Sequence, residues 1–278
     1  MSPVGSGHAE PFFLETADGP RFCLYHAAAA PCRASLVYIH PLAEEMNRSR
    51  QMAAMQARAF AAAGIAVLAL DLHGCGDSGG DFVDASWDGW LRDIAAGRAW
   101  LEAHAGVGAG LWGLRLGGLL ALDAARRTGP PPARLLLWQP VPDGAAHLNQ
   151  FLRLRLAADM LQGGARDDVR ALRARLQSGE TLEVAGYGLT RDLASGMDAA
   201  QATALAPPCP VHWLELAAQE GRTLSPAAVR VAQQWRDAGT TVIQQLVVGP
   251  PFWSTPELTR APALLQASLD AFEGCQHA

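Results

Sequence analysis

The sequence predicts an α/β protein with a mostly parallel central sheet and helices on both of its faces. Between residues 34 and 138, short β-rich runs alternate with longer segments of helical spacing. Parallel strands need such crossover connections, so this alternation is typical of a parallel sheet. A second observation is the apolar run 107–112, which ends in a glycine turn and passes directly into a helical pattern. With 278 residues, 50% of them hydrophobic, the chain can bury the core that one such domain requires.

The individual elements follow from apolar periodicity and from turn residues. Asp18-Gly19, between two alternating runs, is a hairpin signal. Gly64 follows a helical pattern directly, as expected of a glycine that ends a helix. The expected strands are residues 12–16, 21–26, 34–39, 65–70, 107–112, 134–138, 211–216 and 241–248. The expected helices are one that ends at residue 63, and residues 87–104, 116–127, 225–238 and 256–272.

The regular alternation breaks between Asp143 and Pro207. The patterns found there are helices over 147–161 and 168–176, a β-like stretch at 181–184 and a helix from Arg191. None of these segments has the pattern of a strand of the main sheet. We therefore expect a single domain, residues 1–278, with a helical cap or lid inserted at about 144–206 over the carboxyl edge of the sheet.

Composition and charge exclude several classes of function. The net charge is −5 and no basic stripe is present, so we expect no nucleic-acid partner. The five cysteines are scattered without a Cys-x-x-Cys pair, which argues against a metal site or a disulfide framework, and no cofactor is expected. The first ten residues lack an apolar signal region, and no run of about 18 apolar residues could span a membrane. We expect a cytoplasmic protein.

The stretch Leu111–Gly118 (LWGLRLGG) has the frame of a strand-to-helix turn that presents a catalytic serine, Gly-x-Ser-x-Gly. Gly113 and Gly117 occupy the two glycine positions of this frame. The serine position is occupied by Arg115, whose guanidinium stays protonated and is not a nucleophile. The helix that begins at Leu116 offers free N–H groups, which favour an anion.

Several motifs carry a resemblance to known families. The order of strand, Asp-x-x-Gly-x-Gly-x-Ser loop (71–78), helix, strand and Gly-x-x-x-Gly turn resembles the α/β-hydrolase fold over nearly the whole chain. More narrowly, the runs 41–50, 112–117 and 251–253 resemble the exosortase A system-associated hydrolases of the second type, and this resemblance covers most of residues 10–273. That bacterial family is named after a protein-sorting and exopolysaccharide system, and it too has an arginine at the serine position. The resemblance implies a hydrolase fold and, as partners, proteins of that system.

A Ser-His-acid triad has no local candidates. In this fold the acid follows the strand 211–216, where Glu220 lies in a loop whose Gln219 is nearer the expected place. The histidine follows the strand 241–248, but the loop there reads Gly-Pro-Pro-Phe-Trp. His277 lies beyond the last expected helix. We therefore do not expect ordinary serine-hydrolase catalysis.

Two further signals have plain structural explanations. Residues 76–80 spell Gly-Asp-Ser-Gly-Gly, a string found around the serine of chymotrypsin-like proteases, but a motif counts only in its own structural context. Here we expect a glycine turn capped by Ser78, beside an inert Cys75. His40 precedes Pro41, where this fold often has a His-Gly pair, and a hydrogen-bonding role is favoured over a role as a base.

The partner of Arg115 determines whether this position is an anion-binding site or an internal ion pair. With the N–H groups of Leu116 and of the loop around Leu42, Arg115 would form an anion site for a carboxylate, a phosphate or an acidic side chain. Alternatively, Glu44 or Glu45 pairs with it, since a buried charge needs a partner. We expect Trp253 to add an aromatic side chain to this site, beneath the cap. The expected ligand-contacting residues are Arg115, Leu116, Leu42, Glu44, Glu45 and Trp253.

The sequence is compatible with three functions. The first is a non-catalytic binder of an anionic or acyl ligand or an acidic peptide. The second is an atypical hydrolase of esters, thioesters or amides, with Glu44 or Glu45 as general base on water and Arg115 as the clamp. The third is a protein-interaction module whose pocket is plugged. The absence of a histidine after the last strand favours the first and third over the second.

Overall fold

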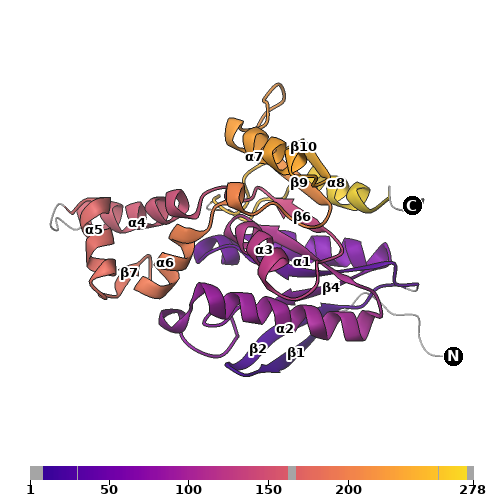
Figure 1. The fold of residues 1–278 in the computed structure, drawn as a ribbon, viewed down its shortest axis with the longest axis horizontal. Helices are drawn as coiled ribbons and strands as arrows, with labels where there is room; N and C mark the ends of the chain where they lie inside the picture. The colour runs from indigo at the N-terminus through magenta and orange to yellow at the C-terminus, as the bar shows by residue number, and fades with distance from the viewer. Residues whose placement is uncertain (1–8, 30, 162–166, 256, 274–278) are drawn as a thin grey trace.

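The computed structural model describes residues 9–29, 31–161, 167–255 and 257–273. Eight strands form one sheet in the order β1-β2-β4-β3-β5-β6-β9-β10, and the six strands from β4 to β10 in this order are parallel (Figure 1). The strands are β1 (Ala9–Thr16), β2 (Gly19–His26), β3 (Ala34–Ile39), β4 (Ile65–Leu70), β5 (Ala109–Leu114), β6 (Leu135–Trp138), β9 (Val211–Ala217) and β10 (Val242–Val248). The expected parallel sheet is confirmed.

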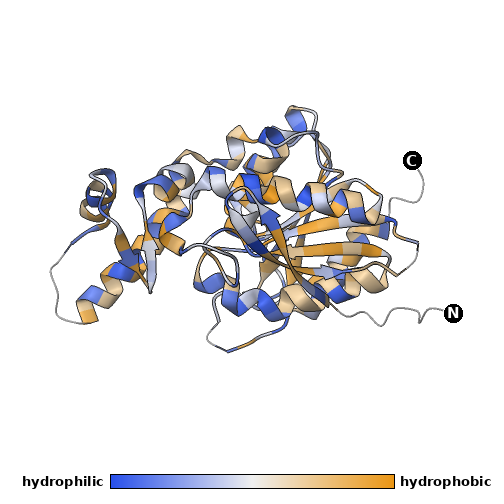
Figure 2. Ribbon diagram, turned by 90° about the horizontal axis from the view of Figure 1, so that it is seen from below, coloured by the Kyte–Doolittle hydropathy of each residue, from blue (hydrophilic) through white to orange (hydrophobic). Residues whose placement is uncertain are grey.

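Helices cover both faces of this sheet. Alternate strand residues explain the two layers: Val37 and Ile39 of β3 pack into one core, and Leu36 and Tyr38 pack into the other. The first core contains α2 (Trp87–Ala105), α3 (Leu116–Arg127) and α7 (Pro226–Asp237), and the second contains α1 (Glu44–Ala62) and α8 (Pro262–Glu273). Figure 2 shows the hydrophobic strands running between these helices.

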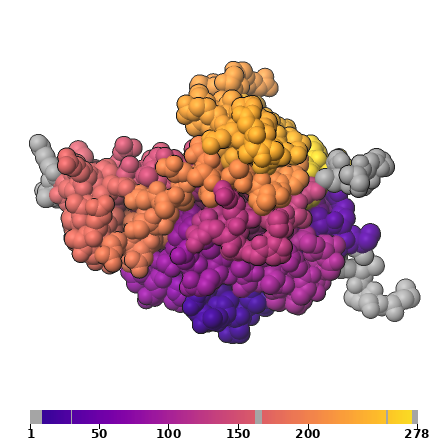
Figure 3. Space-filling model, in the orientation of Figure 1, coloured from indigo at the N-terminus to yellow at the C-terminus, as the bar shows by residue number. Residues whose placement is uncertain are grey.

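In its described residues, the chain between β6 and β9 adds no strand to the main sheet. It forms α4 (Gly144–Leu161), α5 (Val169–Gln177), the two-stranded hairpin β7 (Leu182–Val184) and β8 (Tyr187–Leu189), α6 (Arg191–Ala199) and the short 3₁₀ helix η2 (Ala202–Ala204). We call residues 144–204 the cap segment. It forms a lobe at one end of the molecule (Figure 3). A β-bridge between Asp143 and Gln201 closes its base.

Several boundaries differ from the sequence-based expectation, and one strand is additional. Strand β5 runs from Ala109 to Leu114, two residues later than expected at each end, because Gly113 still pairs with its neighbour strands. The closing helix begins at Pro262 rather than at 256, since proline is favoured at the first helical position. Strand β8 was not expected at all. In the described part of the chain, no helix is long and apolar enough to cross a membrane.

Candidate functional site

Arg115 occupies the strained position of the turn between β5 and α3. Its φ is 55° and its ψ is −119°, a region that side chains rarely adopt and that costs roughly 1–3 kcal/mol. The turn is possible because a Cβ atom at Gly113 would lie 2.4 Å from the carbonyl oxygen of Gly117, and one at Gly117 would lie 2.3 Å from that of Ile39. The geometry that presents a nucleophile is thus retained, with an arginine in its place.

The Arg115 guanidinium is held from two sides. Its Nε donates a hydrogen bond to Oε1 of Glu45 at 3.2 Å, and its Cζ lies 5.4 Å from the ring centroid of the buried Trp253. Within the described residues, Nη1 and Nη2 form no hydrogen bond, and the side chain keeps 18% of its surface exposed. The expected pairing with one of two glutamates is therefore present, and two terminal nitrogens stay free for a ligand.

Glu45 lies in the first turn of α1, directly after the loop that follows β3. Ala43, just before this helix, has a φ of 52°, so the chain is strained here as well as at Arg115. The Oε2 atom of Glu45 is buried and accepts no hydrogen bond from any described residue. Burial raises the pKa of this carboxyl group, and the charge of Arg115 works in the opposite direction. Glu45 is therefore a carboxylate with one unused acceptor.

Glu44 serves a different purpose. Its Oε1 accepts hydrogen bonds from the hydroxyl of Tyr187 at 2.9 Å and from Nδ2 of Asn47 at 3.2 Å. Tyr187 belongs to β8 of the cap segment, and its ring lies 5.1 Å from that of Phe82. Glu44 thus ties the cap segment to α1, and the sequence alone does not distinguish it from Glu45.

His147 of α4 is a site residue that the sequence analysis missed. It is the single histidine of the cap segment and is buried, with no partner for its Nδ1 among the described residues. Burial lowers the pKa of His147 to about 3, and the nearby charge of Arg115 acts in the same direction. The ring is therefore neutral at physiological pH. Its helical spacing with Leu148, Phe151 and Leu152, the buried apolar residues of α4, was the available signal.

A cavity of about 190 Å³ lies between the start of α1 and the cap segment. Its walls combine apolar side chains with the polar groups of Glu45 and His147. They are formed by Leu42, Ala43, Glu44, Glu45, His147, Gln150, Phe151, Leu154 and Ala185. Arg115 and Trp253 are not among these residues, and Arg115 adjoins the cavity through its ion pair with Glu45. Leu116, expected near the ligand, is buried in the core and does not line this cavity.

His40 is fully engaged in hydrogen bonds. Its Nε2 accepts from the backbone N–H of Leu72 at 3.2 Å, so its Nδ1 carries the proton and donates to the carbonyl of Pro41 at 2.8 Å. Burial lowers the pKa of His40, which keeps the ring neutral. Both nitrogens hold loops together, and neither is available as a base.

The two other triad positions are occupied by structural residues. Glu220 is exposed in the loop after β9, whereas the buried Glu215 accepts from the backbone N–H and the hydroxyl of Ser225 and so fixes the start of α7. After β10, Phe252 and Trp253 are packed into the core beneath α8. His277 lies outside the described residues.

The glycine loop after β4 is a structural turn, as expected. The hydroxyl of Ser78 donates to the carbonyl of Asp71 at 2.5 Å and accepts from the N–H of Phe22 at 2.8 Å. Burial raises the pKa of the Cys75 thiol far above its usual range, so this thiol is unreactive. No group of three or more metal-ligating side chains occurs within the described residues.

Comparison with known families identifies the fold. The family model described as serine aminopeptidase, S33 (Hydrolase_4) matches residues 30–219, more than half of the chain. The chain belongs to this family. Comparison with curated protein sequences gives no match.

Solved structures of α/β hydrolases are similar over almost the full length. Est1E from Butyrivibrio proteoclasticus, described with bound ferulic acid, is 16% identical with a TM-score of 0.63, covering 94% of this chain and 97% of its own. A thermostable carboxyl esterase from Bacillus coagulans in complex with glycerol is 14% identical with a TM-score of 0.66, covering 97% and 99%. A serine hydrolase without lid from Xanthomonas campestris is 18% identical with a TM-score of 0.53, covering 97% and 95%. These likenesses establish the α/β-hydrolase fold.

Proposed function

We propose that this chain is a non-catalytic member of its hydrolase family that binds a small acyl ligand with an anionic head group beneath the cap segment. The observation that carries the proposal is the arginine at the nucleophile position, paired with Glu45 beside an apolar cavity. Covalent acyl transfer needs a nucleophile and a base that activates it. Arg115 supplies no nucleophile, and the loop after β10 supplies Phe252 and Trp253 instead of a histidine.

The ligand's two ends meet two different surroundings. The head group accepts hydrogen bonds from Nη1 and Nη2 of Arg115, which are free of protein partners in the described part of the chain; a guanidinium binds carboxylates well because it offers two parallel donors. The acyl part enters the 190 Å³ cavity, where Leu42, Phe151 and Leu154 offer apolar contacts.

The setting of this function is the second part of the proposal. The runs that resemble the exosortase A system-associated family, 41–50, 112–117 and 251–253, contribute Glu45, Arg115 and Trp253. Three residues of the Arg115 site thus lie in the runs that carry the resemblance. We place the protein in the cytoplasm, where its ligand or its protein partners belong to the exopolysaccharide and protein-sorting system.

One observation favours a second candidate, an atypical hydrolase. The unpartnered Oε2 of Glu45 lies beside a cation and at the wall of a cavity, which is the arrangement a general base on water requires. In this alternative Arg115 stabilises the negative charge that develops on the carbonyl oxygen. A plugged pocket that serves only protein contacts is the third possibility.

Binding and turnover measurements separate these functions. We expect hexanoate to bind in isothermal titration, with at least a tenfold loss in Arg115→Met and no loss in the control Arg170→Met, which removes an exposed arginine of α5. We expect no labelling by a fluorophosphonate probe and no hydrolysis of p-nitrophenyl hexanoate above a boiled control. Hydrolysis that disappears in Glu45→Gln identifies the atypical hydrolase. If hexanoate does not bind and p-nitrophenyl hexanoate is not hydrolysed, the ligand-binding and hydrolase functions are both contradicted. The protein-interaction module then remains.

A further inference from the structure

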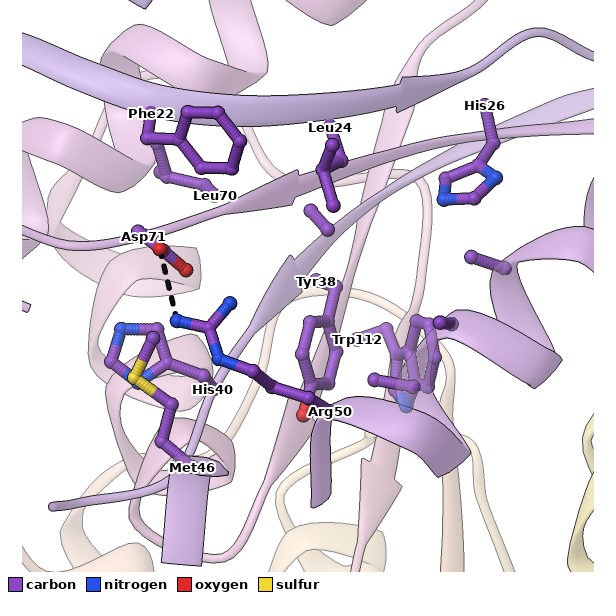
Figure 4. Close-up of a pocket in the computed structure, with 14 residues that line it drawn as sticks. Phe22, Leu24, His26, Tyr38, His40, Met46, Arg50, Leu70, Asp71 and Trp112 are labelled. Carbon is purple, nitrogen blue, oxygen red and sulfur yellow. Dashed lines mark hydrogen bonds and ion pairs between the residues drawn. The ribbon is translucent and has the colours of Figure 1, made fainter. Parts of the chain in front are cut away.

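A second cavity, of about 180 Å³, lies between α1 and the strands β2, β4 and β3 and shares no lining residue with the first (Figure 4). One wall is a face of α1 that carries the small residues Ala53, Ala54 and Ala57. The facing wall consists of Phe22 and Leu24 of β2. The cavity exists because alanines leave unfilled the space that larger side chains of α1, such as Met52 and Phe60, fill elsewhere in the same core. We call this cavity the α1 slot.

The end of the α1 slot at the carboxyl edge of the sheet carries no free charge. Nη2 of Arg50 donates to Oδ2 of Asp71 at 3.2 Å, and the same oxygen accepts from the N–H of Asp77 at 3.1 Å. The dashed line in Figure 4 marks the pair of Arg50 and Asp71. His40, which borders the slot at this end, has both ring nitrogens in use. This end is therefore neutral as a whole and favours an uncharged ligand.

The opposite end holds a polar group without a partner. His26, the last residue of β2, is only 3% exposed, and its buried Nδ1 forms no hydrogen bond with any described residue. Its ring points from β2 toward the slot (Figure 4). Burial lowers the pKa of His26, so the ring is neutral and can donate or accept one hydrogen bond at this nitrogen. A buried polar atom without a partner is costly, and a ligand hydroxyl would remove that cost.

We infer that the α1 slot binds a small, uncharged, monocyclic aromatic molecule of the phenol class, with its ring between the alanine face and Phe22 and its hydroxyl bonded to His26. The size fits, because an engineered apolar cavity of about 150 Å³ is known to bind benzene. The walls fit as well: Tyr38 and Trp112, whose rings lie 4.4 Å apart, add aromatic surface beside Phe22, and aromatic rings pack favourably edge to face. This site is separate from the Arg115 site and does not depend on the function proposed there.

The test uses the full chain with phenol and benzene as probes, measured by saturation-transfer NMR and titration. Phenol should bind saturably and several-fold tighter than benzene. Ala57→Leu fills the slot and should weaken phenol binding at least tenfold. Two controls should leave binding unchanged: Ala62→Leu, the same change at an exposed position of α1, and Arg115→Met at the other site.

Two outcomes overturn the inference. One is phenol binding that is absent or does not saturate in the unmodified protein. The other is phenol binding that Ala57→Leu leaves intact; should this variant fail to fold by its melting curve, Ala53→Leu replaces it. The hydroxyl contact has its own readout, because His26→Phe should bind phenol and benzene equally. A preference for phenol that survives His26→Phe contradicts the assigned hydrogen bond.

Discussion

Two arginine–carboxylate pairs of this molecule have the same chemistry and opposite surroundings. Arg21 of β2 and Asp93 of α2 are joined at 2.7 Å, and their side chains are 0% and 1% exposed. Arg115 and Glu45 are joined at 3.2 Å, and their side chains are 18% and 23% exposed. The first pair is a short contact in the core, and the second is a longer contact beside a cavity.

The pairs differ most in how their other atoms are used. Both oxygens of Asp93 accept hydrogen bonds, one from Nε of Arg21 and one from the N–H of His73. Nη1 of Arg21 donates to three backbone carbonyls of the β1–β2 turn, so only its Nη2 lacks a partner. Glu45 keeps one oxygen unused, and Arg115 keeps two nitrogens unused within the described chain. The carboxylate of the first pair is saturated within the fold, whereas the second pair has the unpartnered donors and acceptors that the proposed ligand site requires.

The largest effect should come from breaking the saturated pair. Asp93→Asn leaves the Arg21 charge buried without a counter-charge, and breaking a buried pair in this way typically costs about 3–5 kcal/mol of unfolding free energy. Urea denaturation followed by circular dichroism measures this loss. The matched change Asp18→Asn, which breaks an exposed pair with Arg92, should leave the midpoint almost unchanged. Equal small losses in both variants would contradict the structural role of Arg21 and Asp93.

The second pair should show a smaller effect that depends on pH. Burial raises the pKa of Glu45 in the folded state, so its contribution to stability is fully present below the pKa of an unfolded glutamate. That contribution is lost as the pH rises through the folded pKa. Arg115 limits this rise in pKa, so the pKa of Glu45 should be higher still in Arg115→Met. The loss of stability at high pH should therefore be larger in that variant. We expect Arg115→Met to lower the unfolding free energy by about 1–3 kcal/mol at pH 8, between the values for exposed and buried pairs. At pH 5 the decrease, measured by the same urea denaturation, should be smaller.

A double-mutant cycle assigns this pH dependence to one glutamate. In a Glu45→Gln background, Arg115→Met should cost the same at both pH values, because the titrating partner is gone. In a Glu44→Gln background the pH dependence should persist, since Glu44 bonds to Tyr187 instead. If Arg115→Met lowers the unfolding free energy equally at pH 5 and pH 8 in the unmodified background, the difference drawn between the two pairs is contradicted.

The sequence predicts the fold far better than the partners of each site residue. Apolar periodicity locates the sheet and the elbow, because Gly113 and Gly117 are required by close backbone contacts that no other residue permits. The choice between Glu44 and Glu45 is different. Neighbouring residues of a helix point about 100° apart, and which one faces Arg115 depends on how α1 rolls against the sheet.

Two other features were beyond sequence reasoning for physical reasons. His147 lines the same cavity as Glu45, although the two residues lie more than a hundred positions apart in the sequence. The α1 slot depends on which side of α1 its alanines face and on what packs opposite them. Both depend on tertiary packing, which local patterns do not encode.

The smallest expected effect concerns catalysis: Arg115→Ser should produce no esterase activity. The variant places a hydroxyl in the strained elbow that presents nucleophiles in this fold, yet a serine hydroxyl needs a positioned base. His40 is engaged at both nitrogens, and the loop after β10 offers none. Among the described residues, His147 is the histidine whose pKa responds to Arg115, and burial, the larger cause of its low pKa, persists when Arg115 is removed. Turnover of p-nitrophenyl acetate that is absent in the parent would show that a base exists. Its loss in Arg115→Ser/His147→Ala would then identify that base as His147, and the pair of Arg115 and Glu45 would be a blocked catalytic site rather than a binding site.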